Sequence, residues 1–527
     1  MTLPRRRFLA ASAAALAAPV IARAQNSRLL KFIPQSDLAV LDPVWTQAYV
    51  TRNHGLMVFD TLYGMDGTYQ VQPQMADGHN VEDDGKTWLI TLRDGLAWHT
   101  GEKVVARDCV ASIRRWGARD SFGQTLMAVT DALDAPDDRT IRFRLKRPFP
   151  LLTAALGKAG SSICAMMPER LATTDPFKQV SEMTGSGPFR FIAKDHVPGS
   201  LIAYERNAAY VPRPSGTPSF TAGPKIVHFD RVEWHVLPDP TTAAAAMQAG
   251  EFDWWEAPTF DLLPLLRKAD NLTVPAPNPL GFLGGIRFNQ LQPPFNNPAL
   301  RRALLGAVKQ EDFMISAAGT DPQNWRTGIG FFCPQSPMAS AVGMEVLTGP
   351  RDLAAVKRAV EASGYKGEKT VVPVPTDFPG LRALADVGVD MMQKAGLNVE
   401  ARFTDWGSML QTLPKMDPVE QGGWSAFYTY WSGLDQFDPA VHVWIRGNGR
   451  AATRGWPDSP KLEALRDQWL ATDDLGDQKR IAEDIQRQAF IDVPYIPVGQ
   501  ILPTWTYQKT ITDVLQGYAL FWNVRKA

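Results

Sequence analysis

The sequence predicts an α/β fold, because strand and helix patterns are mixed along the whole chain. Stretches 140–146, 231–237 and 397–403 alternate apolar and polar residues, as strands with one buried face do. Stretches 296–313 and 380–396 have helical periodicity. The same ingredients also fit an α+β arrangement, which stays open at this point.

Each of these stretches has a local signature. The strand at 231–237 puts His235 on the solvent side, opposite Trp234. The helix in 296–313 begins with Asn297 as its N-cap and Pro298 at its first position, a well-matched start. The strand at 140–146 directs three apolar side chains to one face: Ile141, Phe143 and Leu145.

Residues 370–403 predict a strand–helix–strand unit. A first strand is expected at 370–374, and a last strand at 397–403 follows the helix, which ends at Gly396. The last strand places Leu397, Val399, Ala401 and Phe403 on one face. The helix carries one apolar stripe, made of Leu381, Leu384, Ala385, Met391, Met392 and Ala395.

The N-terminus has the layout of an export signal. Arginines 5–7 precede Phe8–Leu9 and an apolar, alanine-rich run, and Ala22–Ala24 supplies a small-x-small cleavage site. The paired arginines are typical of twin-arginine export. The run is shorter than the ~20 residues that a spanning helix needs. We therefore expect a signal peptide at 1–24, a mature chain beginning at Gln25, and a soluble periplasmic protein.

The mature chain would be too large for one core, and its proline-rich 275–279 stretch is the expected domain boundary. Cleavage removes four arginines and no acid, leaving 51 basic against 55 acidic residues, a net charge of −4. This balance indicates neither nucleic-acid nor anionic-membrane binding. The odd number of cysteines predicts no disulfide framework, and Cys109 has the spacing of a buried helical thiol.

Motifs for catalysis or cofactor binding are missing from the sequence. It contains no dinucleotide, phosphate-loop, zinc-protease or serine-hydrolase signature. The glycine-rich 183–189 stretch fits a tight turn into a strand, and His228 and His235 have the wrong spacing for a metal site. We therefore assign no catalytic residue, cofactor or metal ligand, and an exported enzyme remains only as an alternative.

Several motifs in order resemble the family 5 solute-binding proteins, the extracytoplasmic receptors of dipeptide and oligopeptide ABC importers. The longest is residues 76–116, "ADGHNVEDDGKTWLITLRDGLAWHTGEKVVARDCVASIRRW". The others are "GSGPFRF" with "YERNAAYV", "LPDPTTAAAAMQAGEFDWWE", "FNQLQPPFNNPALRRALLGAVKQEDF" and "DVPYIPVGQ". They extend from about residue 30 to residue 525.

The resemblance implies a periplasmic-binding-protein type of fold with an additional third subdomain. Two lobes close around a ligand, and one lobe contains two subdomains. Domain I would comprise 26–59, 181–275 and 495–527; domain II would be 60–180, and domain III would be 276–494. The implied partners are a membrane permease and its ATPase subunits, and the receptor would be a monomer without a cofactor.

Residues 431–439, "WSGLDQFDP", resemble the family segment whose first acid receives the ligand's α-ammonium group. Asp435 takes that position, and Trp431 and Trp406 match two tryptophans of the ligand cleft. Here one residue more than usual separates Trp431 from Asp435. Asp438 precedes a proline and fits an Asx turn.

For a terminal carboxylate of the ligand, the nominees are Arg446 and Arg454 in "WIRGNGRAATRGWP", since an arginine fork suits a carboxylate. The family also takes glutathione, opines, haem, metal chelates and sugars. The expected ligand is a short peptide or another amine-bearing solute, with these non-peptide ligands as alternatives. A periplasmic sensor or chaperone-like binder without a transporter is a further class.

Overall fold

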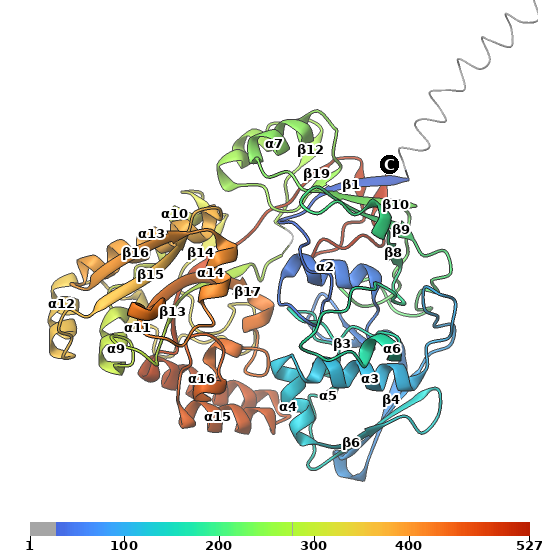
Figure 1. Cartoon of the computed structure of the whole chain (residues 1–527), viewed down its shortest axis with the longest axis horizontal. Helices are drawn as coiled ribbons and strands as arrows, with labels where there is room; N and C mark the ends of the chain where they lie inside the picture. The colour runs from blue at the N-terminus through green and yellow to red at the C-terminus, as the bar shows by residue number, and fades with distance from the viewer. Residues whose placement is uncertain (1–27, 277) are drawn as a thin grey trace, which may run out of the picture. The chain divides into compact units, whose positions relative to one another are not determined.

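The computed structural model describes residues 28–276 and 278–527, so the expected signal peptide at 1–24 lies outside the described residues. By its internal contacts the chain divides into two compact units. The first contains the described residues up to Arg147, with Leu152–Pro277 and Thr504–Ala527; the second contains Pro148–Leu151 and Asn278–Pro503. The main break therefore falls within the proline-rich 275–279 boundary (Figure 1).

The larger sheet of the first unit has the strand order β12-β19-β11-β1-β10-β9-β8. β1 pairs in parallel with β10 and β11, and the other pairs are antiparallel. All of these strands come from the ranges expected for domain I. Their bounds are β1 Leu29–Ile33, β8 Phe189–Phe191, β9 Leu201–Arg206, β10 Arg231–His235, β11 Trp254–Trp255, β12 Leu272–Thr273 and β19 Thr506–Gln508.

On β10 the expected alternation is confirmed. Val232 and Trp234 are fully buried, while His235 is partly exposed and bonds Glu233 at the surface. The strand ends at His235, so Val236 lies beyond it. Before β8, the glycine-rich turn packs on α2 (Tyr49–Val58): a Cβ at Gly185 would overlap the carbonyl of Val58.

A second sheet of the first unit is antiparallel, in the order β4-β5-β7-β6, and helix α3 (Ala106–Gly117) packs against it. The strand expected at 140–146 is β7, and its three apolar side chains are buried. Cys109 on α3 is a fully buried free thiol, as its spacing predicted. The strands are β4 Ala76–Glu82, β5 Thr87–Leu92, β6 Thr130–Asp134 and β7 Thr140–Leu145.

Shorter elements complete the first unit. Its remaining helices are α4 Ser121–Val129, α5 Leu152–Leu156, α6 Glu169–Ala172, α7 Pro240–Gln248 and α8 Leu263–Leu266. Two short antiparallel pairs are β2 Tyr63–Met65 with β3 Val71–Pro73, and β20 Ile511–Thr512 with β21 Arg525–Lys526.

The central sheet of the second unit has the order β14-β18-β13-β17. Its strands are β13 Phe282–Phe288, β14 Trp325–Arg326, β17 Ala426–Ser432 and β18 Tyr495–Ile501. The sequence placed the return to domain I at residue 495, but β18 belongs to this sheet and the second unit extends to Pro503. β18 is buried along its whole length and pairs with β13 and β14, which fixes it in this core.

The strand–helix–strand unit is confirmed as β15 (Lys369–Pro375), α13 (Pro379–Lys394) and β16 (Asn398–Thr404). The two strands pair in parallel, as such a connection requires. Gly396 follows the helix with φ +100°. The expected apolar face of β16 is incompletely covered: Phe403 is 57% exposed, because its strand lies at an edge, and Arg382 lies over its ring.

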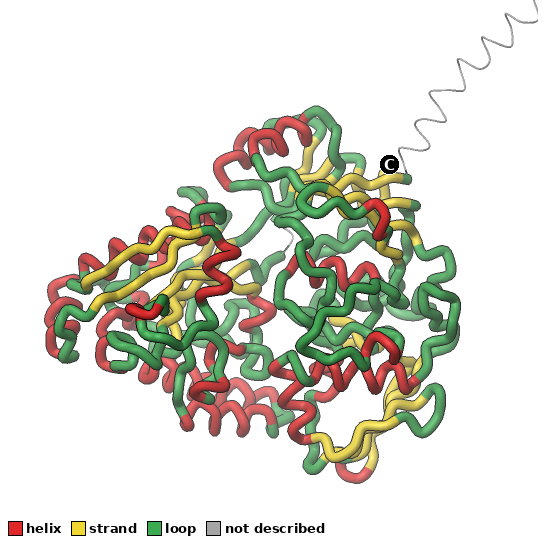
Figure 2. Tube along the Cα trace, viewed as in Figure 1, coloured by secondary structure: helices red, strands yellow, loops and turns green. Residues whose placement is uncertain are grey.

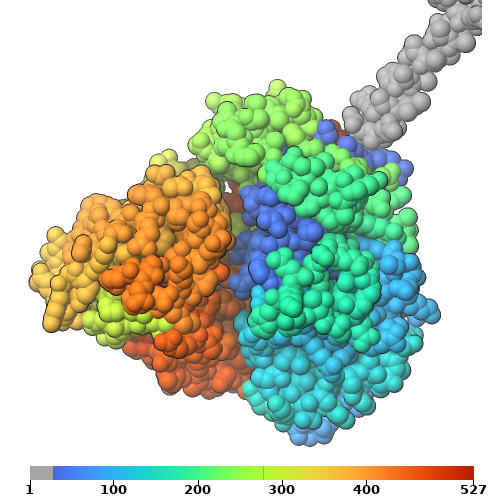
Figure 3. Space-filling model, in the orientation of Figure 1, coloured from blue at the N-terminus to red at the C-terminus, as the bar shows by residue number. Residues whose placement is uncertain are grey.

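The helical stretch at 296–313 starts as expected, since the Asn297 side chain accepts from the backbone of Ala299. It forms two helices, α9 (Pro298–Leu305) and α10 (Gln310–Ala318). The other helices are α11 Glu345–Thr348, α12 Leu353–Ala362, α14 Trp406–Thr412, α15 Pro460–Leu470 and α16 Leu475–Asp492. α15 and α16 pack side by side (Figure 2). In Figure 3 residues 278–503 of the second unit, coloured from yellow-green to red, form one continuous body.

Gly388 of α13 tests the packing of this helix on β17. A Cβ at Gly388 would overlap the ring of the buried Tyr428. Gly388→Ala should therefore lower the free energy of unfolding by about 1–3 kcal/mol, as overpacking does. Gly380→Ala in the same helix is the control, because its Cβ would lie 3.8 Å from Tyr430. The control should leave stability unchanged or raise it by less than about 1 kcal/mol. Equal effects in urea denaturation would contradict the packing argument.

Candidate functional site

Strand β17 divides the aromatic residues near its end between two faces of the sheet. Successive strand residues point to opposite faces. Tyr430 points towards α13, where its ring contacts Phe378, the N-cap residue of that helix (centroids 5.9 Å apart). Trp431 points the other way and contacts Trp444, with ring centroids 5.7 Å apart. Trp444 belongs to the short 3₁₀ helix η6 (Val443–Ile445).

Trp406 lies on the Tyr430 face. It is the first residue of α14, and its backbone amide donates to Asp377 at 2.7 Å. Its ring contacts Phe378 edge-on at 5.7 Å. Both tryptophans expected at the site are partly exposed, but they belong to different aromatic groups. The structure therefore brings Trp431 to Trp444, and Trp406 to Phe378, rather than to each other.

Asp435 is a buried carboxylate, with 3% of the residue exposed. It lies in the 3₁₀ turn η5 (Gly433–Gln436), which directly continues β17. Ser432 caps this turn by accepting from the amide of Leu434. The extra residue that separates Asp435 from Trp431 is therefore accommodated in a helical turn, and not in an extended loop.

The turn is tightly packed at Gly433. A Cβ there would overlap the carbonyl of Leu280 and would lie 2.7 Å from Cys333 Sγ. The Cys333 amide also donates to the Gln436 carbonyl at 3.0 Å. Burial raises the pKa of the Cys333 thiol to about 12, so this cysteine stays protonated at neutral pH. Only glycine fits at the first position of the turn that carries Asp435.

Gln436 links the turn to the aromatic group of Trp431. The Tyr495 hydroxyl donates to Gln436 Oε1 at 3.0 Å, and the Tyr495 ring contacts Trp444 at 5.0 Å. Asp435 therefore lies between Trp431 and Gln436, two residues that are both tied to the Trp444–Tyr495 pair. The end of β17, which carries Trp431, and the turn η5, which carries Asp435, are thus held by the same Trp444–Tyr495 pair.

Asp438 has the turn role that the sequence predicted. Its Oδ1 accepts from the backbone amides of Ala440 at 2.8 Å and Val441 at 3.2 Å. The two carboxylates of the 431–439 stretch thus differ in kind. Asp438 serves its own backbone, whereas Asp435 is held inside a packed turn.

The two nominated arginines differ in the same way. Arg446 forms a bidentate pair with Glu463, with Nη2 and Oε2 2.9 Å apart. Burial opposes ionisation of Glu463, but the hydrogen bonds and charge of Arg446 outweigh it and lower the pKa of Glu463. Among the described residues, no side chain pairs with the guanidinium of Arg454, and burial lowers the pKa of Arg454. Of the two arginines, Arg454 is therefore the one whose guanidinium donors are not used by a described side chain.

Sequence reasoning missed four residues around this site: Arg287, His442, Trp444 and Tyr495. All four are buried. His442 Nε2 lies 2.8 Å from the Phe331 carbonyl and 3.0 Å from the Tyr495 hydroxyl. Tyr495 lies in the quoted "DVPYIPVGQ" motif, but no spacing or motif marks the other three residues. Their grouping depends on which segments meet at one face of the sheet.

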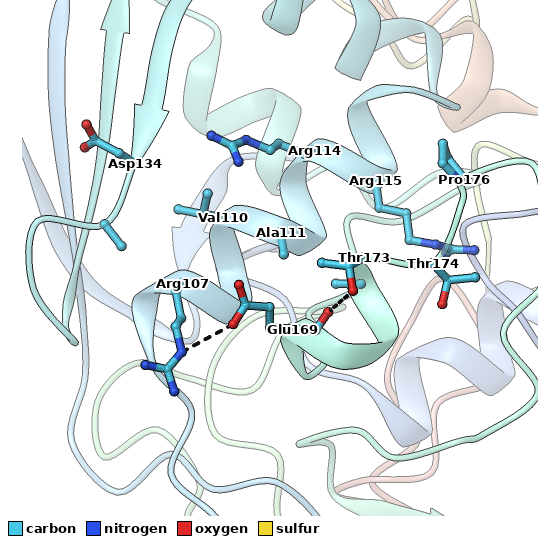
Figure 4. Close-up of a pocket in the computed structure, with 12 residues that line it drawn as sticks. Arg107, Val110, Ala111, Arg114, Arg115, Asp134, Glu169, Thr173, Thr174 and Pro176 are labelled. Carbon is cyan, nitrogen blue, oxygen red and sulfur yellow. Dashed lines mark hydrogen bonds and ion pairs between the residues drawn. The ribbon is translucent and has the colours of Figure 1, made fainter.

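The first unit has a separate pocket of about 510 Å³ along α3 and α6 (Figure 4). Its charged groups already have partners within the unit. Arg107 pairs with Glu169 at 3.4 Å, and Arg115 pairs with Asp42 at 2.7 Å. The Arg114 guanidinium donates to the Leu133 carbonyl. These internal pairs leave the second unit with the better candidate site.

Residues 28–276 and 278–527 contain neither a metal-binding cluster nor a membrane-spanning helix. No group of three or more His, Cys, Asp or Glu side chains is placed to hold a metal ion. None of the helices in this part of the chain has the length and apolar character needed to cross a bilayer.

The family model for bacterial extracellular solute-binding proteins, family 5, matches residues 70–452. The chain belongs to this family. A probable peptide ABC transporter periplasmic-binding protein of Sinorhizobium fredii is 37% identical over 537 residues and covers 100% of both chains. The expected family is thus confirmed, and with it a solute-binding rather than an enzyme family.

Solved structures of similar fold support the same architecture. The binding protein AgaA of A. tumefaciens, in complex with agropinic acid, has a TM-score of 0.80 at 17% identity, covering 95% of this chain and 99% of that one. DppA of Helicobacter pylori, in complex with the peptide STSA, has a TM-score of 0.78 at 19% identity, covering 94% and 98%. The α/β class and the periplasmic-binding-protein fold of this family 5 protein are thereby confirmed.

Buried histidines predict how the stability of this solute-binding protein depends on pH. Burial lowers the pKa of His442 to about 3, that of His54 to about 3 and that of His99 to about 4. Below about pH 6.5 the unfolded chain takes up protons at these residues, while the folded chain does not. The free energy of unfolding should therefore fall as the pH decreases from 6.5 towards 3, by at most about 1.4 kcal/mol per pH unit for each histidine.

Urea denaturation of His442→Gln at several pH values checks this contribution. The variant should show a shallower loss of stability between about pH 6.5 and pH 4, since one proton-linked group is gone. Thr370→Val, at a buried residue that carries no titratable group, is the control and should keep the original slope. An unchanged slope for His442→Gln would show that this residue does not contribute to the pH dependence.

Proposed function

We propose that this protein is the periplasmic substrate-binding receptor of an ABC importer, which captures short peptides or related amine-bearing solutes. The observation that carries the proposal is Asp435, a carboxylate buried at the end of β17 in the segment that matches the ammonium-binding segment of the family. The name of the Sinorhizobium fredii relative supports peptide transport, and so does the peptide bound to DppA of Helicobacter pylori.

A buried carboxylate is suited to an ammonium ion. Inside a protein, an ammonium group requires a charged, hydrogen-bonded partner to offset the loss of its hydration. Aromatic rings beside it add contact area at small entropic cost and attract cations through their faces. Trp431, four residues before Asp435 in the chain, is proposed as this wall. Trp406, on the other face of β17, would contact a different part of the ligand.

Arg454 is the better of the two nominated residues for the carboxylate end of a ligand. The fork of Arg446 is already occupied by Glu463, so a ligand would have to break a bidentate pair to use it. Arg454 requires no such exchange, since none of the described side chains pairs with it. A planar guanidinium offers a carboxylate two parallel hydrogen bonds.

The proposed receptor performs no chemistry. A ligand shifts the population from an open to a closed form, to the extent that it binds the closed form better. The closed form would deliver its ligand to a membrane permease driven by cytoplasmic ATPase subunits. We also propose that the protein is a monomer and that it is exported by the twin-arginine route, with cleavage after Ala24. The first unit would divide into domain I and domain II.

A second candidate is the same receptor role for a non-peptide solute. The agropinic acid bound to AgaA of A. tumefaciens favours this candidate, because the two folds agree over most of both chains. Glutathione, chelates and sugars belong to the same alternative. An exported enzyme is the less favoured candidate, and substrate turnover by the purified protein would support it.

Substitution of Asp435 tests the ammonium role. Asp435→Asn should lower the affinity for a free-amine peptide by about 2–5 kcal/mol, as removal of one partner of a buried charge pair does. Asp438→Asn is the matched control, because an asparagine oxygen can still accept the two backbone hydrogen bonds of the turn. The control should stay within about 0.5 kcal/mol of the unaltered protein. Isothermal titration calorimetry gives both values, and equal affinities would remove Asp435 from the site.

The natural ligand can be identified from material that co-purifies with the mature protein expressed in the periplasm. We expect mass spectrometry after mild denaturation to show short peptides or other free-amine compounds, because Asp435 would select them. A sugar, a chelate or an amine-free acid would favour the second candidate and would argue against the role proposed for Asp435.

A further inference from the structure

Arg287 of β13 is a fully buried arginine, with 0% of the residue exposed. In the described part of the chain it forms no ion pair with a carboxylate. Burial of a guanidinium is unfavourable unless its donors are satisfied. Burial accordingly lowers the pKa of Arg287 to about 9, which still leaves it charged at neutral pH. The protein therefore maintains an uncompensated positive charge in the core of the second unit.

The hydrogen bonds of Arg287 within the described residues all go to backbone carbonyls, one in the 3₁₀ helix η6 and three in loops. Nη1 donates to Trp444 at 2.6 Å and to Pro494 at 3.1 Å, while Nε donates to Arg454 at 2.6 Å. Nη2 donates to Thr453 at 3.3 Å. One side chain thus ties both ends of the segment 444–455 to β13. Carbonyls in irregular loops have no ladder partner of their own, so this arginine provides their hydrogen bonds.

The segment 444–455 carries the groups that the proposed site uses. Its first residue, Trp444, supports Trp431 by ring contact. Near its end, Arg454 offers a guanidinium with no partner among the described side chains. Arg287 bonds the carbonyls of both residues, and so fixes the backbone from which each side chain extends.

Two glycines allow the segment to come this close. A Cβ at Gly285 would lie 2.6 Å from the Trp444 ring. A Cβ at Gly455 would lie 2.6 Å from the Phe288 carbonyl and 2.7 Å from Arg287 Nε, and its φ of +103° favours glycine in any case. The close approach of the segment to β13 therefore requires a glycine on the strand, Gly285, and a glycine in the segment, Gly455.

We propose that Arg287 is a positioning residue for ligand binding: it holds segment 444–455 so that Trp444 supports Trp431 and Arg454 presents an unpaired cation to an anionic group of the ligand. The proposal rests on the proposed function as a receptor and extends it to a residue that does not contact the ligand. Recognition of the ligand's carboxylate would then depend on a guanidinium buried behind the site.

Arg287→Lys tests the holding role without any ligand. Lysine keeps the charge but cannot reach four carbonyls in three directions. We expect the backbone amides of 444–456 to exchange with deuterium about tenfold faster, as the loss of a charge-assisted hydrogen bond implies. Arg301→Lys is the matched control, since Arg301 is also buried and donates only to the carbonyls of Phe295 and Asp492.

The control should speed exchange near residues 295 and 492 and leave 444–456 unchanged. Unchanged exchange of 444–456 in Arg287→Lys would overturn the proposal. Equally fast exchange throughout the second unit in both variants would overturn it as well, because Arg287 would then serve general stability only.

The role in binding is tested with the peptide Ala-Phe-Ala as the free acid and as its C-terminal amide. Arg454→Gln should weaken binding of the acid by about tenfold and leave binding of the amide nearly unchanged. Arg287→Lys should show the same selective loss, and the double variant should lose no more than Arg454→Gln alone. Purely structural damage would weaken acid and amide alike, and that result would overturn the proposal.

The two experiments separate failure of the inference from failure of the proposed function. If the unaltered protein binds neither peptide, the peptide-receptor function and the binding half of the inference fail together. The exchange measurement still decides the other half, namely whether Arg287 holds segment 444–455. If Arg454→Gln binds the acid normally, the proposed contact of Arg454 is wrong, and so is the inference that Arg287 presents it.

Discussion

The second unit depends on strand β13, which lies between β17 and β18 with both faces covered. Two consecutive glycines set how closely its neighbours approach: a Cβ at Gly284 would lie 2.8 Å from Val498, and one at Gly285 would lie 2.6 Å from Trp444. Close packing of this kind resists the insertion of even a methyl group. The positions of Trp444, of Trp431 against it and of the turn after β17 all follow from this central strand.

Buried cations are satisfied in two ways. Arg115 pairs with Asp42, and Lys225 pairs with Asp60 at 2.7 Å, so these pairs are neutral inside the first unit. Arg93 of the first unit and Arg287 of the second unit donate instead to backbone carbonyls. Arg454 differs from both groups, since none of the described side chains pairs with it, and in the proposed role its donors are left for the ligand.

The alternation of β17 gives the proposed site two separate parts. Trp431 belongs to the side of Trp444 and Tyr495, and Trp406 belongs to the side of Tyr430 and Phe378. A ligand that used both tryptophans would extend past the end of the strand. The ends of a short extended molecule would then be recognised by charge, and its middle by aromatic area. The same framework can serve relatives with different ligands, since each part can vary independently.

Local patterns were enough to predict mixed strands and helices: the alternation in β7 and β10, the Asn297 cap, and the apolar stripe of α13 that ends at Gly396. The boundary at 275–279 was predicted from its prolines, and the family from the resemblance of several motifs in order along the chain. The Asx role of Asp438 is equally local. Local pattern misled at 296–313, where one helical periodicity covers the two helices α9 and α10. The boundary at residue 495 came from the family resemblance, whereas β18, which begins there, pairs within the second unit.

Which charged side chains meet could be seen only once the chain was folded. Nothing near Arg446 in the sequence shows that Glu463 occupies its fork, and nothing in "GGIRFN" shows that Arg287 is buried under the segment 444–455. The fold also places Trp406 and Trp431 in different aromatic groups, although the family resemblance assigns both tryptophans to the ligand cleft. The physical reason is the same in each case. Burial and pairing depend on which helices, strands and loops the fold brings together, whether the partners are 17 positions apart, as Arg446 and Glu463 are, or 157, as Arg287 and Trp444 are. Local periodicity carries no information about these contacts.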